Sequence, residues 1–251
     1  MQDEEIIYED GEHKCIIFSF DNEENEESFL AVNQYLIIQN SSAILIDPGS
    51  LSSYDELYDR VSKHIEIEKL KYIFYSHQDP DVAGSIGKWS VSCGARQIVS
   101  KQWMRFMSHY GLMNYNRVFP LEDKGAKISF GKEYLQFIPA HFLHSAANFS
   151  LYDSRSKILF SGDIGASITK EYGANTQGLK FEDMKETLLN FHQRYMAGNK
   201  FCKAWVKKVR EHDVQTIAPQ HGSLLSGIDC QKFLSWFEEL ECGGDLIDRY
   251  Y

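Results

Sequence analysis

The sequence predicts an α/β fold in which two β-sheets pack face to face and helices cover both outer faces, an αββα sandwich. The predicted elements form two similar halves, and each half consists of several strands followed by helices. Such an order is typical of layered α/β domains. The chain has 251 residues, enough for a large core, and no low-complexity linker divides it. We therefore expect a single domain over residues 1–251.

Four apolar runs in the first half predict strands. The acidic stretch 21–27 is typical of a solvated hairpin loop between the first two. Asp47-Pro48-Gly49 is a turn sequence that ends the third. The four predicted strands are Lys14–Phe20, Phe29–Gln39, Ser42–Asp47 and Leu70–Tyr75.

A helix is predicted between the third and fourth strands. Ser53, with Glu56 three positions later, matches the capping-box pattern. Apolar residues at helical spacing then mark one buried face, formed by Tyr54, Leu57, Val61 and Ile65.

A further strand at Arg96–Ser100 and a helix at Lys101–His109 complete the first half. The second half repeats the order of strands and then helices. Its predicted strands are Lys127–Phe130, Glu133–Ile138, Phe149–Asp153, Lys157–Ser161 and Val214–Ala218. Its predicted helices are one with the stripe Phe181, Met184, Leu188, Phe191 and Tyr195, one carrying Phe201, Trp205 and Val209, and Asp229–Leu240.

Composition excludes several classes of protein. The net charge of −10 argues against a nucleic-acid partner. The acidic start predicts no signal peptide, and no apolar run is long enough to span a membrane. The five cysteines are scattered without a Cys-x-x-Cys pair, so we expect reduced thiols in the cytoplasm and no thiolate metal site.

One loop has the composition of a metal site. His77, Asp79 and Asp81 follow the Leu70–Tyr75 strand at alternate positions, and Pro80 restricts the backbone between the two carboxylates. Sites gather at the carboxyl ends of strands in layered α/β proteins. Taken alone, the loop is equally consistent with a solvated acidic turn.

Three further strand ends deliver residues of the same kind. His144, or alternatively His141, follows one strand, Asp163 follows a second and His221 a third. A lone histidine is more often a surface residue than a ligand, but the shared placement beside Gly or Pro favours a common site. Three histidines and three carboxylates suit two metal ions that share a bridging carboxylate. The oxygen-rich set shifts the preference from zinc toward iron or manganese.

These motifs resemble those of the metallo-β-lactamase superfamily, which has the αββα fold, and more narrowly the diiron domain of flavodiiron proteins. The family's His-x-Glu-x-Asp-His loop is similar to residues 77–82, and its Pro-Ala-x-x-Leu-His segment matches 139–144. Its Lys-Ile-Leu-Phe-Ser-x-Asp segment matches 157–163, and Ile-Ala-Pro-x-His-Gly matches 217–222. The resemblance spans most of the chain and selects His144 over His141.

The resemblance implies two iron ions, with a bridging oxo, hydroxo or O2-derived ligand. One iron is expected to bind His77, Asp79 and His144, the other Asp81 and His221, with Asp163 as the bridge. Val82 stands where the family usually has a histidine, which implies an open coordination position. We also expect no flavodoxin-like domain and no flavin in this chain. Both departures resemble the smaller oxygen-binding diiron proteins.

The resemblance implies an O2-binding diiron protein that senses oxygen, with a link to chemotaxis signalling. Alternatives are an O2 or NO reductase with an external electron donor, a dinuclear zinc hydrolase, and a metal-free interaction protein, so whether the chain is an enzyme stays open. Expected partners are O2 or NO and a signalling or electron-donor protein; the resemblance also suggests a homodimer.

Two tyrosines are candidates for contacts around the metals. Tyr172 and Tyr75 lie on or next to loops near the expected site, where they are positioned to donate to a bound oxygen species. The remaining histidines lie away from the strand ends, and we expect them to be exposed or satisfied locally: His13, His64, His109, His192 and His212.

Overall fold

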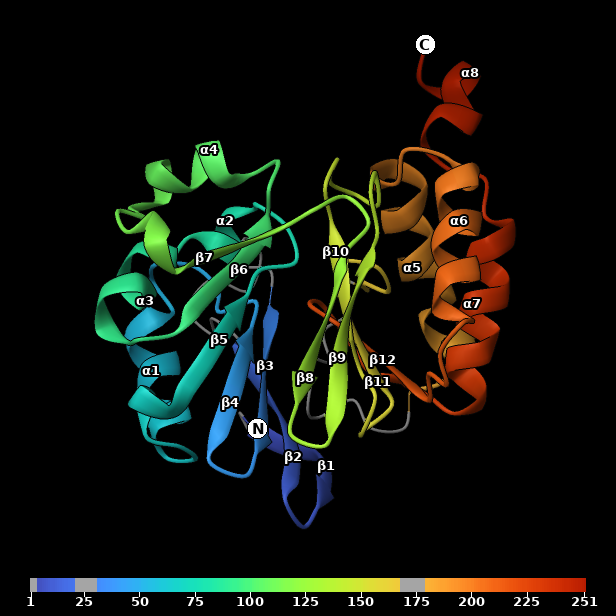
Figure 1. The fold of residues 1–251 in the computed structure, drawn as a ribbon. Helices are drawn as coiled ribbons and strands as arrows, with labels where there is room; N and C mark the ends of the chain where they lie inside the picture. The colour runs from blue at the N-terminus through green and yellow to red at the C-terminus, as the bar shows by residue number, and fades with distance from the viewer. Residues whose placement is uncertain (1–3, 21–30, 168–178) are drawn as a thin grey trace.

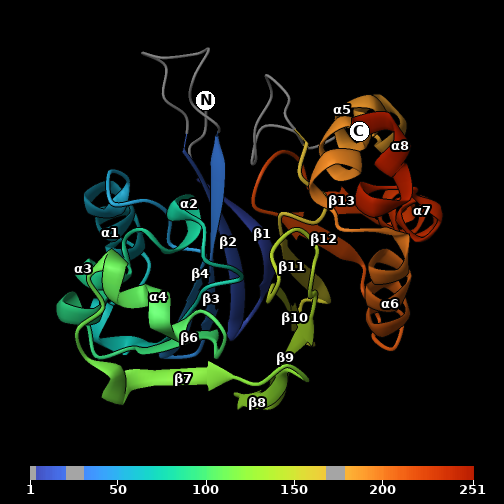
Figure 2. The same cartoon turned by 90° about the horizontal axis from the view of Figure 1, so that it is seen from above.

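The computed structural model describes residues 4–20, 31–167 and 179–251. Within these ranges the strands form two sheets that face each other, and helices cover the outer face of each sheet (Figure 1). Seen from above, the layers follow the order helices, sheet, sheet, helices (Figure 2). The predicted αββα sandwich is confirmed.

Sheet A is formed by the first half of the chain. Within the described residues it has seven strands, which lie side by side in their sequence order. The first four pair antiparallel, and the fourth to seventh are parallel. The strands are β1 (Glu4–Asp10), β2 (His13–Phe20), β3 (Val32–Gln39), β4 (Ser42–Ile46), β5 (Leu70–Phe74), β6 (Arg96–Ser100) and β7 (Val118–Leu121).

Sheet B is formed by the second half, and its described strands follow the order β13-β12-β11-β10-β9-β8. β11 and β12 are parallel, so their carboxyl ends lie together. The other neighbours pair antiparallel. The strands are β8 (Ala126–Phe130), β9 (Glu133–Pro139), β10 (Phe149–Asp153), β11 (Ile158–Gly162), β12 (Thr216–Pro219) and β13 (Leu225–Ser226).

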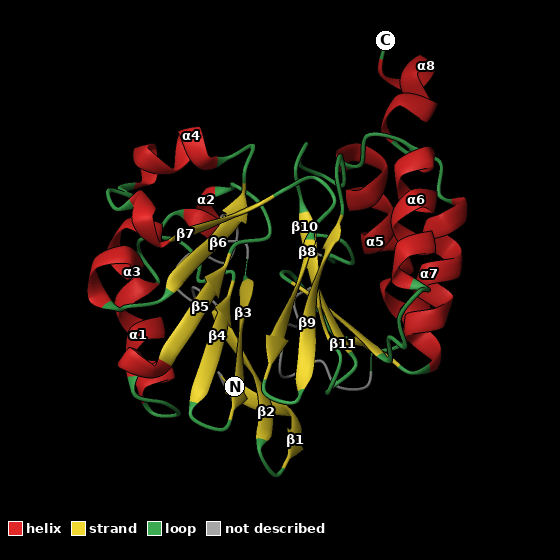
Figure 3. Cartoon of the chain, viewed as in Figure 1, coloured by secondary structure: helices red, strands yellow, loops and turns green. Residues whose placement is uncertain are grey.

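The helices are divided between the two outer faces (Figure 3). The face of sheet A carries α1 (Tyr54–Ser62), α2 (Pro80–Ala83), α3 (Ile86–Ser92) and α4 (Met104–Met107). The face of sheet B carries α5 (Phe181–Tyr195), α6 (Asn199–Val209) and α7 (Ile228–Glu239), with α8 (Ile247–Tyr250) beyond them. Short 3-10 turns lie at Ile67–Lys69, Ser108–Tyr110, Tyr115–Arg117 and Gly243–Leu246.

Apolar side chains fill the three spaces between the four layers. Between the sheets, the rings of Phe74 and Phe137 lie 5.0 Å apart. Trp89 is fully buried between sheet A and its helices, and Trp205 is buried between sheet B and its helices. Burial of this kind is the main stabilising contribution to such a sandwich. The polar strand ends are thereby held on a packed scaffold.

The structure differs from the sequence prediction at several elements. β1, β7 and β13 were not predicted; β1 is rich in acidic residues and half exposed, and β13 has two residues. The expected capping box is wrong, because the Ser53 hydroxyl donates to Ser50 O at 3.1 Å and does not cap α1. The helix expected at Lys101–His109 is shorter. The acidic stretch 21–27 lies outside the described residues.

Candidate metal centre

The loop after β5 is held by buried hydrogen bonds. The backbone N–H of Ser76 donates to Asp47 Oδ1 at 2.7 Å, and Ser76 Oγ lies 2.9 Å from His77 Nδ1. His77 is buried, and its Nε2 is left to face the centre. Asp79 is extended, as expected for a residue that precedes proline, and Pro80 begins α2.

Asp163 lies at the middle of the candidate site. It follows Gly162, whose φ of +61° suits glycine, and a Cβ there would lie 3.0 Å from Ser76 Oγ. Asp163 Oδ2 lies 2.8 Å from His144 Nε2 and 3.8 Å from His77 Nε2. The strand end, the glycine and the neighbouring β5 loop thus bring a buried carboxylate against two imidazoles.

The other oxygen of Asp163 faces a different histidine. His221 follows β12, and its Nε2 lies 3.5 Å from Asp163 Oδ1 and 3.3 Å from Asp81 Oδ2. His221 Nδ1 donates to Ala31 O at 2.8 Å, which fixes the ring and turns Nε2 toward the carboxylates.

The six side chains expected from the sequence therefore lie together, in two sets that share Asp163. His77, His144 and Asp79 surround Oδ2, with His144 Nε2 3.6 Å from Asp79 Oδ2. Asp81 and His221 lie on the side of Oδ1. His77, His144 and Asp163 each direct one ligand atom to within 4.8 Å of the other two, a spacing that suits a metal ion.

One buried atom in this cluster lacks a hydrogen-bond partner among the described residues. Asp163 Oδ1 is enclosed and accepts no hydrogen bond from them. A buried carboxylate oxygen is costly to leave without a partner. A cation between Oδ1, Asp81 and His221 would satisfy it, so the residues present fit a metal on this side as well.

The charges of the cluster shift its pKa values. Burial raises the pKa of Asp163, but the positive charges of His77, His221 and His144 outweigh this and hold the pKa well below its usual range. Burial lowers the pKa of His221, but Asp163 and Asp81 outweigh it and raise the value to about 9. Burial lowers the pKa of His77. Positive charge on His221 thus balances the carboxylates, a role that metal ions take over when they displace protons.

Sequence reasoning missed Gln78, which connects the two sheets. Gln78 Nε2 donates to Asp79 Oδ1 at 2.7 Å, and Ser145 Oγ donates to Gln78 Oε1 at 2.6 Å. The bond to Oδ1 leaves Asp79 Oδ2 free to face the two histidines. The position of Gln78 inside the His-x-Asp loop was the only signal available.

Asp47 was also missed as a site residue. It is fully enclosed, its φ is +50°, and burial raises its pKa to about 7. Because its Oδ1 accepts from the N–H of Ser76, it positions the residue that precedes His77. The sequence presented Asp47 only as a turn residue before Pro48.

His192 supports Asp163 from α5. Its Nδ1 donates to Leu188 O at 2.6 Å, so Nε2 is the acceptor for the N–H of Gly165 at 2.9 Å. Burial lowers the pKa of His192 to about 4, which keeps the ring neutral. The turn that carries Asp163 is therefore anchored to the helix layer. We expected His192 to form its hydrogen bonds locally, but its link to the candidate site was not expected.

Aromatic residues adjoin His144. Tyr195 and Phe191 stack on each other, and their rings lie 5.8 and 6.2 Å from that of His144. The Tyr75 hydroxyl instead donates to Gln97 Oε1 at 2.7 Å in the core under sheet A, contrary to the expected donation to a bound oxygen species. Tyr172 lies outside the described residues.

Two other expectations concern neighbours of the ligand motifs. His141 Nε2 bonds Asp123 O at 2.7 Å, away from the cluster that contains His144. Val82 is fully buried in the core between sheet A and its helices. Valine offers no ligand atom, so the set around Asp81 and His221 is smaller than the set around His77.

Two further features lie outside this centre. His13, Cys15 and Asp153 form a second buried group with metal-binding side chains. There, His13 bonds both Gln39 Oε1 and Asp153 Oδ2 at 2.7 Å, so its ring nitrogens are already satisfied.

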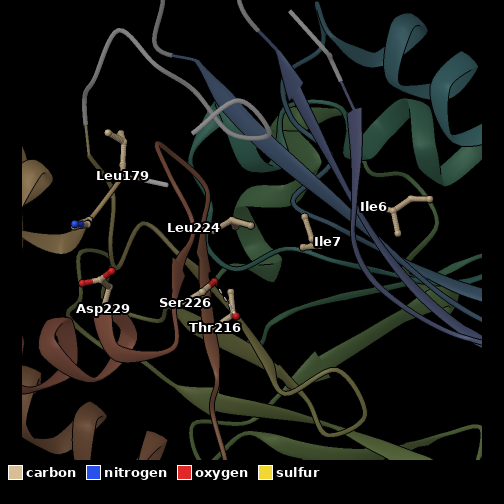
Figure 4. A pocket seen from close by; sticks show the side chains of 8 residues that line it. Ile6, Ile7, Leu179, Thr216, Leu224, Ser226 and Asp229 are labelled. Carbon is tan, nitrogen blue, oxygen red and sulfur yellow. Dashed lines mark hydrogen bonds between the residues drawn. The ribbon is translucent and has the colours of Figure 1, made fainter. Parts of the chain in front are cut away.

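A hollow of about 510 Å³ is lined by residues of β1, β12, β13 and the start of α7, and none of the six clustered side chains borders it (Figure 4).

The chain resembles known proteins across most of its length. A family model described as "ODP family beta lactamase" matches residues 30–222. A solved structure of a peroxy diiron species of chemotaxis sensor ODP has a TM-score of 0.87 and 36% identity, covering 99% of this chain and 100% of that one. The apo state of chemotaxis sensor ODP from T. denticola has a TM-score of 0.86 and 38% identity, covering 99% of each chain.

More distant relatives are longer proteins. A flavodiiron protein mutant from Thermotoga maritima has a TM-score of 0.73 at 20% identity over 94% of this chain and 60% of its own, which indicates a shared fold. An uncharacterised Methanocaldococcus jannaschii protein is 29% identical, and a nitric oxide reductase from Moorella thermoacetica is 25% identical. Each alignment covers 76% of this chain and 48% of the relative, so the chain spans about half the length of these curated proteins.

None of the helices in the described residues is both long and apolar enough to cross a bilayer.

Proposed function

Since the chain belongs to the ODP family of β-lactamase-fold proteins, we propose that it binds two iron ions between its sheets and takes up O2 there as an oxygen sensor. The observation that carries this proposal is the position of Asp163. Its two oxygens face two separate sets of metal-binding side chains, and Oδ1 is buried without a hydrogen-bond partner among the described residues.

The distances support one assignment of ligands. His77, Asp79 and His144 would hold one iron, Asp81 and His221 would hold the other, and Asp163 would contribute one oxygen to each side. Three carboxylates balance three of the four charges on two dications, and an oxygen-rich set favours iron or manganese over zinc. When bound, an iron pair supplies the electrons that O2 requires to bind strongly.

The remaining residues of the site hold these groups in place. Gln78 and Ser145 fix the orientation of Asp79, Ala31 O fixes the ring of His221, and His192 anchors the turn of Asp163. Hydrogen bonds of this kind orient ligand atoms before the metal arrives. The valine at position 82 supports O2 uptake beside Asp81 and His221, where the protein offers fewer ligands.

We propose that a signalling protein of the chemotaxis system responds to O2 binding by this chain. Two solved relatives that match this chain over nearly its full length are chemotaxis sensors by name. The cytoplasmic location and the homodimer stay predictions from the sequence.

The experiment is an anaerobic O2 titration. The protein is loaded with iron, reduced, freed of excess reductant and mixed with increasing O2 while its absorption spectrum is recorded. The proposal predicts a new band that saturates near one O2 per pair of irons. An unchanged spectrum in a protein that contains two irons per chain would contradict the proposal.

A reductase is the second candidate, because one relative is named nitric oxide reductase. In the presence of excess reductant and a redox mediator, a reductase consumes O2 or NO continuously, whereas a sensor takes up a single equivalent per centre. Sustained consumption would overturn the sensor assignment. Full zinc occupancy of the purified protein with hydrolysis of a model ester would instead establish a zinc hydrolase.

A further inference from the structure

Two buried thiols from distant parts of the chain are in contact in the helix layer over sheet B. Cys202 on α6 and Cys242, before the Gly243–Leu246 turn, are 40 positions apart, and their sulfur atoms lie 3.7 Å from each other. Both side chains have no exposed surface. The other cysteines contact different atoms: Cys15 contacts Asp153, Cys93 contacts Trp89 O and Cys230 contacts Val214 O.

We propose that Cys202 and Cys242 are a modification site, a dithiol that hydrogen peroxide oxidises to an intramolecular disulfide. The two sulfur atoms are in van der Waals contact at 3.7 Å, and a disulfide would shorten this separation to about 2.05 Å. The proposal depends on this sulfur contact and is independent of the metal centre.

The oxidation takes two steps. The contact between the two sulfur atoms lowers the pKa of Cys242 and raises that of Cys202, which favours Cys242 as the first thiol to react. The first thiol attacks peroxide as its thiolate and becomes a sulfenic acid, with release of hydroxide. The other thiol then attacks that sulfur, and the hydroxyl leaves as water. Two thiols lose two electrons and two protons, and one H2O2 becomes two waters.

Access to the pair depends on local opening of a small segment. Cys242 is followed by the single 3-10 turn Gly243–Leu246, in which Leu246 is the buried side chain. Asp245 Oδ2 accepts from the N–H groups of Asn199 and Cys242, at 2.6 and 3.2 Å, and holds this turn against the start of α6. Segments with few buried contacts open at lower free energy than the core.

The disulfide would also restrict the motion of a chain of backbone hydrogen bonds that leads to the loop of the metal site. The N–H of Gly244 donates to Ala197 O, and the N–H of Ala197 donates to Phe142 O. Phe142 lies two residues before His144. α8 extends beyond the N-terminal end of α6 in this region (Figure 1). Oxidation is therefore expected to reduce the opening of residues 243–250 and of the Ala197 amide.

The test counts thiols in the full metal-loaded chain. The reduced protein is exposed to H2O2, quenched with catalase, denatured in N-ethylmaleimide and weighed by mass spectrometry. We expect the number of alkylated cysteines to fall from five to three, and peptide mapping to find the Cys202–Cys242 cross-link. C230S is the matched control, in which a pair of thiols is still lost.

Neither C202S nor C242S is expected to form an intramolecular cross-link after the same dose, because each lacks one cysteine of the pair. Five alkylated cysteines in the treated wild-type protein, or loss of thiols at other positions, would overturn the proposal without any variant. Hydrogen exchange adds a second readout: slower exchange of residues 243–250 in the cross-linked form is expected, and unchanged exchange would contradict the proposed fixing of this segment.

Discussion

The hydroxyl of Ser145 donates a 2.6 Å hydrogen bond to Gln78 Oε1 and joins the loop after β5 in sheet A to the loop between β9 and β10 in sheet B. Gln78 passes this constraint to Asp79 Oδ1 through its amide. Two of the sequence segments that carry the proposed ligands are therefore tied together by side chains that do not bind metal themselves.

Q78L is expected to weaken metal binding. It removes the donor to Asp79 Oδ1 and the acceptor for Ser145, so Asp79 loses its fixed orientation. Changes of this kind typically cost about 10- to 100-fold in metal affinity. Competition with a chelator measures the effect, and Q231L, on the exposed face of α7, is the matched control. Equal affinities of Q78L and Q231L would refute the positioning role.

D163N and D81N are expected to differ in metal stoichiometry. Asp163 faces both sets of ligands, so D163N should reduce the content from two metals to fewer than one per chain. Asp81 lies 3.3 Å from His221, on one side of the centre only, so the D81N protein should keep about one metal ion per chain. Elemental analysis of the purified variants checks this, with the exposed D55N as control. A D163N protein that retains two metals would show that Asp163 is not the bridge.

H192F is expected to destabilise the turn of Asp163. It leaves the buried N–H of Gly165 without its acceptor, a loss of about 1–3 kcal/mol. Urea unfolding measures the free energy, and chelator competition should show weaker metal binding as well. H109F changes an exposed histidine on the other helix layer and should be neutral. Unchanged metal affinity in H192F would leave His192 with a purely structural role.

The His13–Asp153 pair is expected to make stability depend on pH. Burial lowers the pKa of His13, but the bond to Asp153 outweighs burial and raises the pKa of His13 above 6.5. Burial raises the pKa of Asp153, but the bond to His13 outweighs burial and holds the pKa of Asp153 below 3.8. The contribution of His13 is full below pH 6.5 and is lost as pH rises through its folded pKa. That of Asp153 is full above pH 3.8 and is lost as pH falls through its folded pKa.

D153N should therefore cost most between pH 3.8 and 6.5, by about 3 kcal/mol, because it leaves His13 buried without a charged partner. Denaturant unfolding across this range measures the difference. D213N breaks an exposed pair with Lys157 and should have a much smaller effect, because solvent screens exposed ion pairs. A pH-independent difference between D153N and the wild-type protein would contradict the assignment.

The proposed ligands could be predicted from the sequence because each follows an apolar strand directly. His77, Asp163 and His221 are placed by the strand that precedes them. β11 and β12 are neighbours in sheet B, and the packing of the two sheets brings the end of β5 next to theirs. The supporting residues could not be predicted in the same way. Gln78 acts through Ser145, 67 positions away, and His192 acts through Gly165, 27 positions away. Such contacts depend on how the layers pack, which local patterns do not specify.

The errors in the predicted fold also arise from contacts that local patterns do not specify. β1 was missed because its burial comes from pairing with β2 at the edge of the sheet and not from an apolar pattern of its own. Ser53 has the residue type of a cap, yet its hydroxyl is taken by Ser50 O in the preceding turn. Tyr75 follows the end of β5 but is directed into the core, where its hydroxyl donates a hydrogen bond to Gln97 Oε1.

The most direct test of the iron pair is the position of iron in crystals of the iron-loaded protein, measured by anomalous diffraction at the iron edge. We expect two iron peaks about 3.5 Å apart, one bound by His77, Asp79 and His144, the other by Asp81 and His221, with Asp163 bound to both. A single peak, or two peaks with Asp163 bound to only one of them, would contradict it.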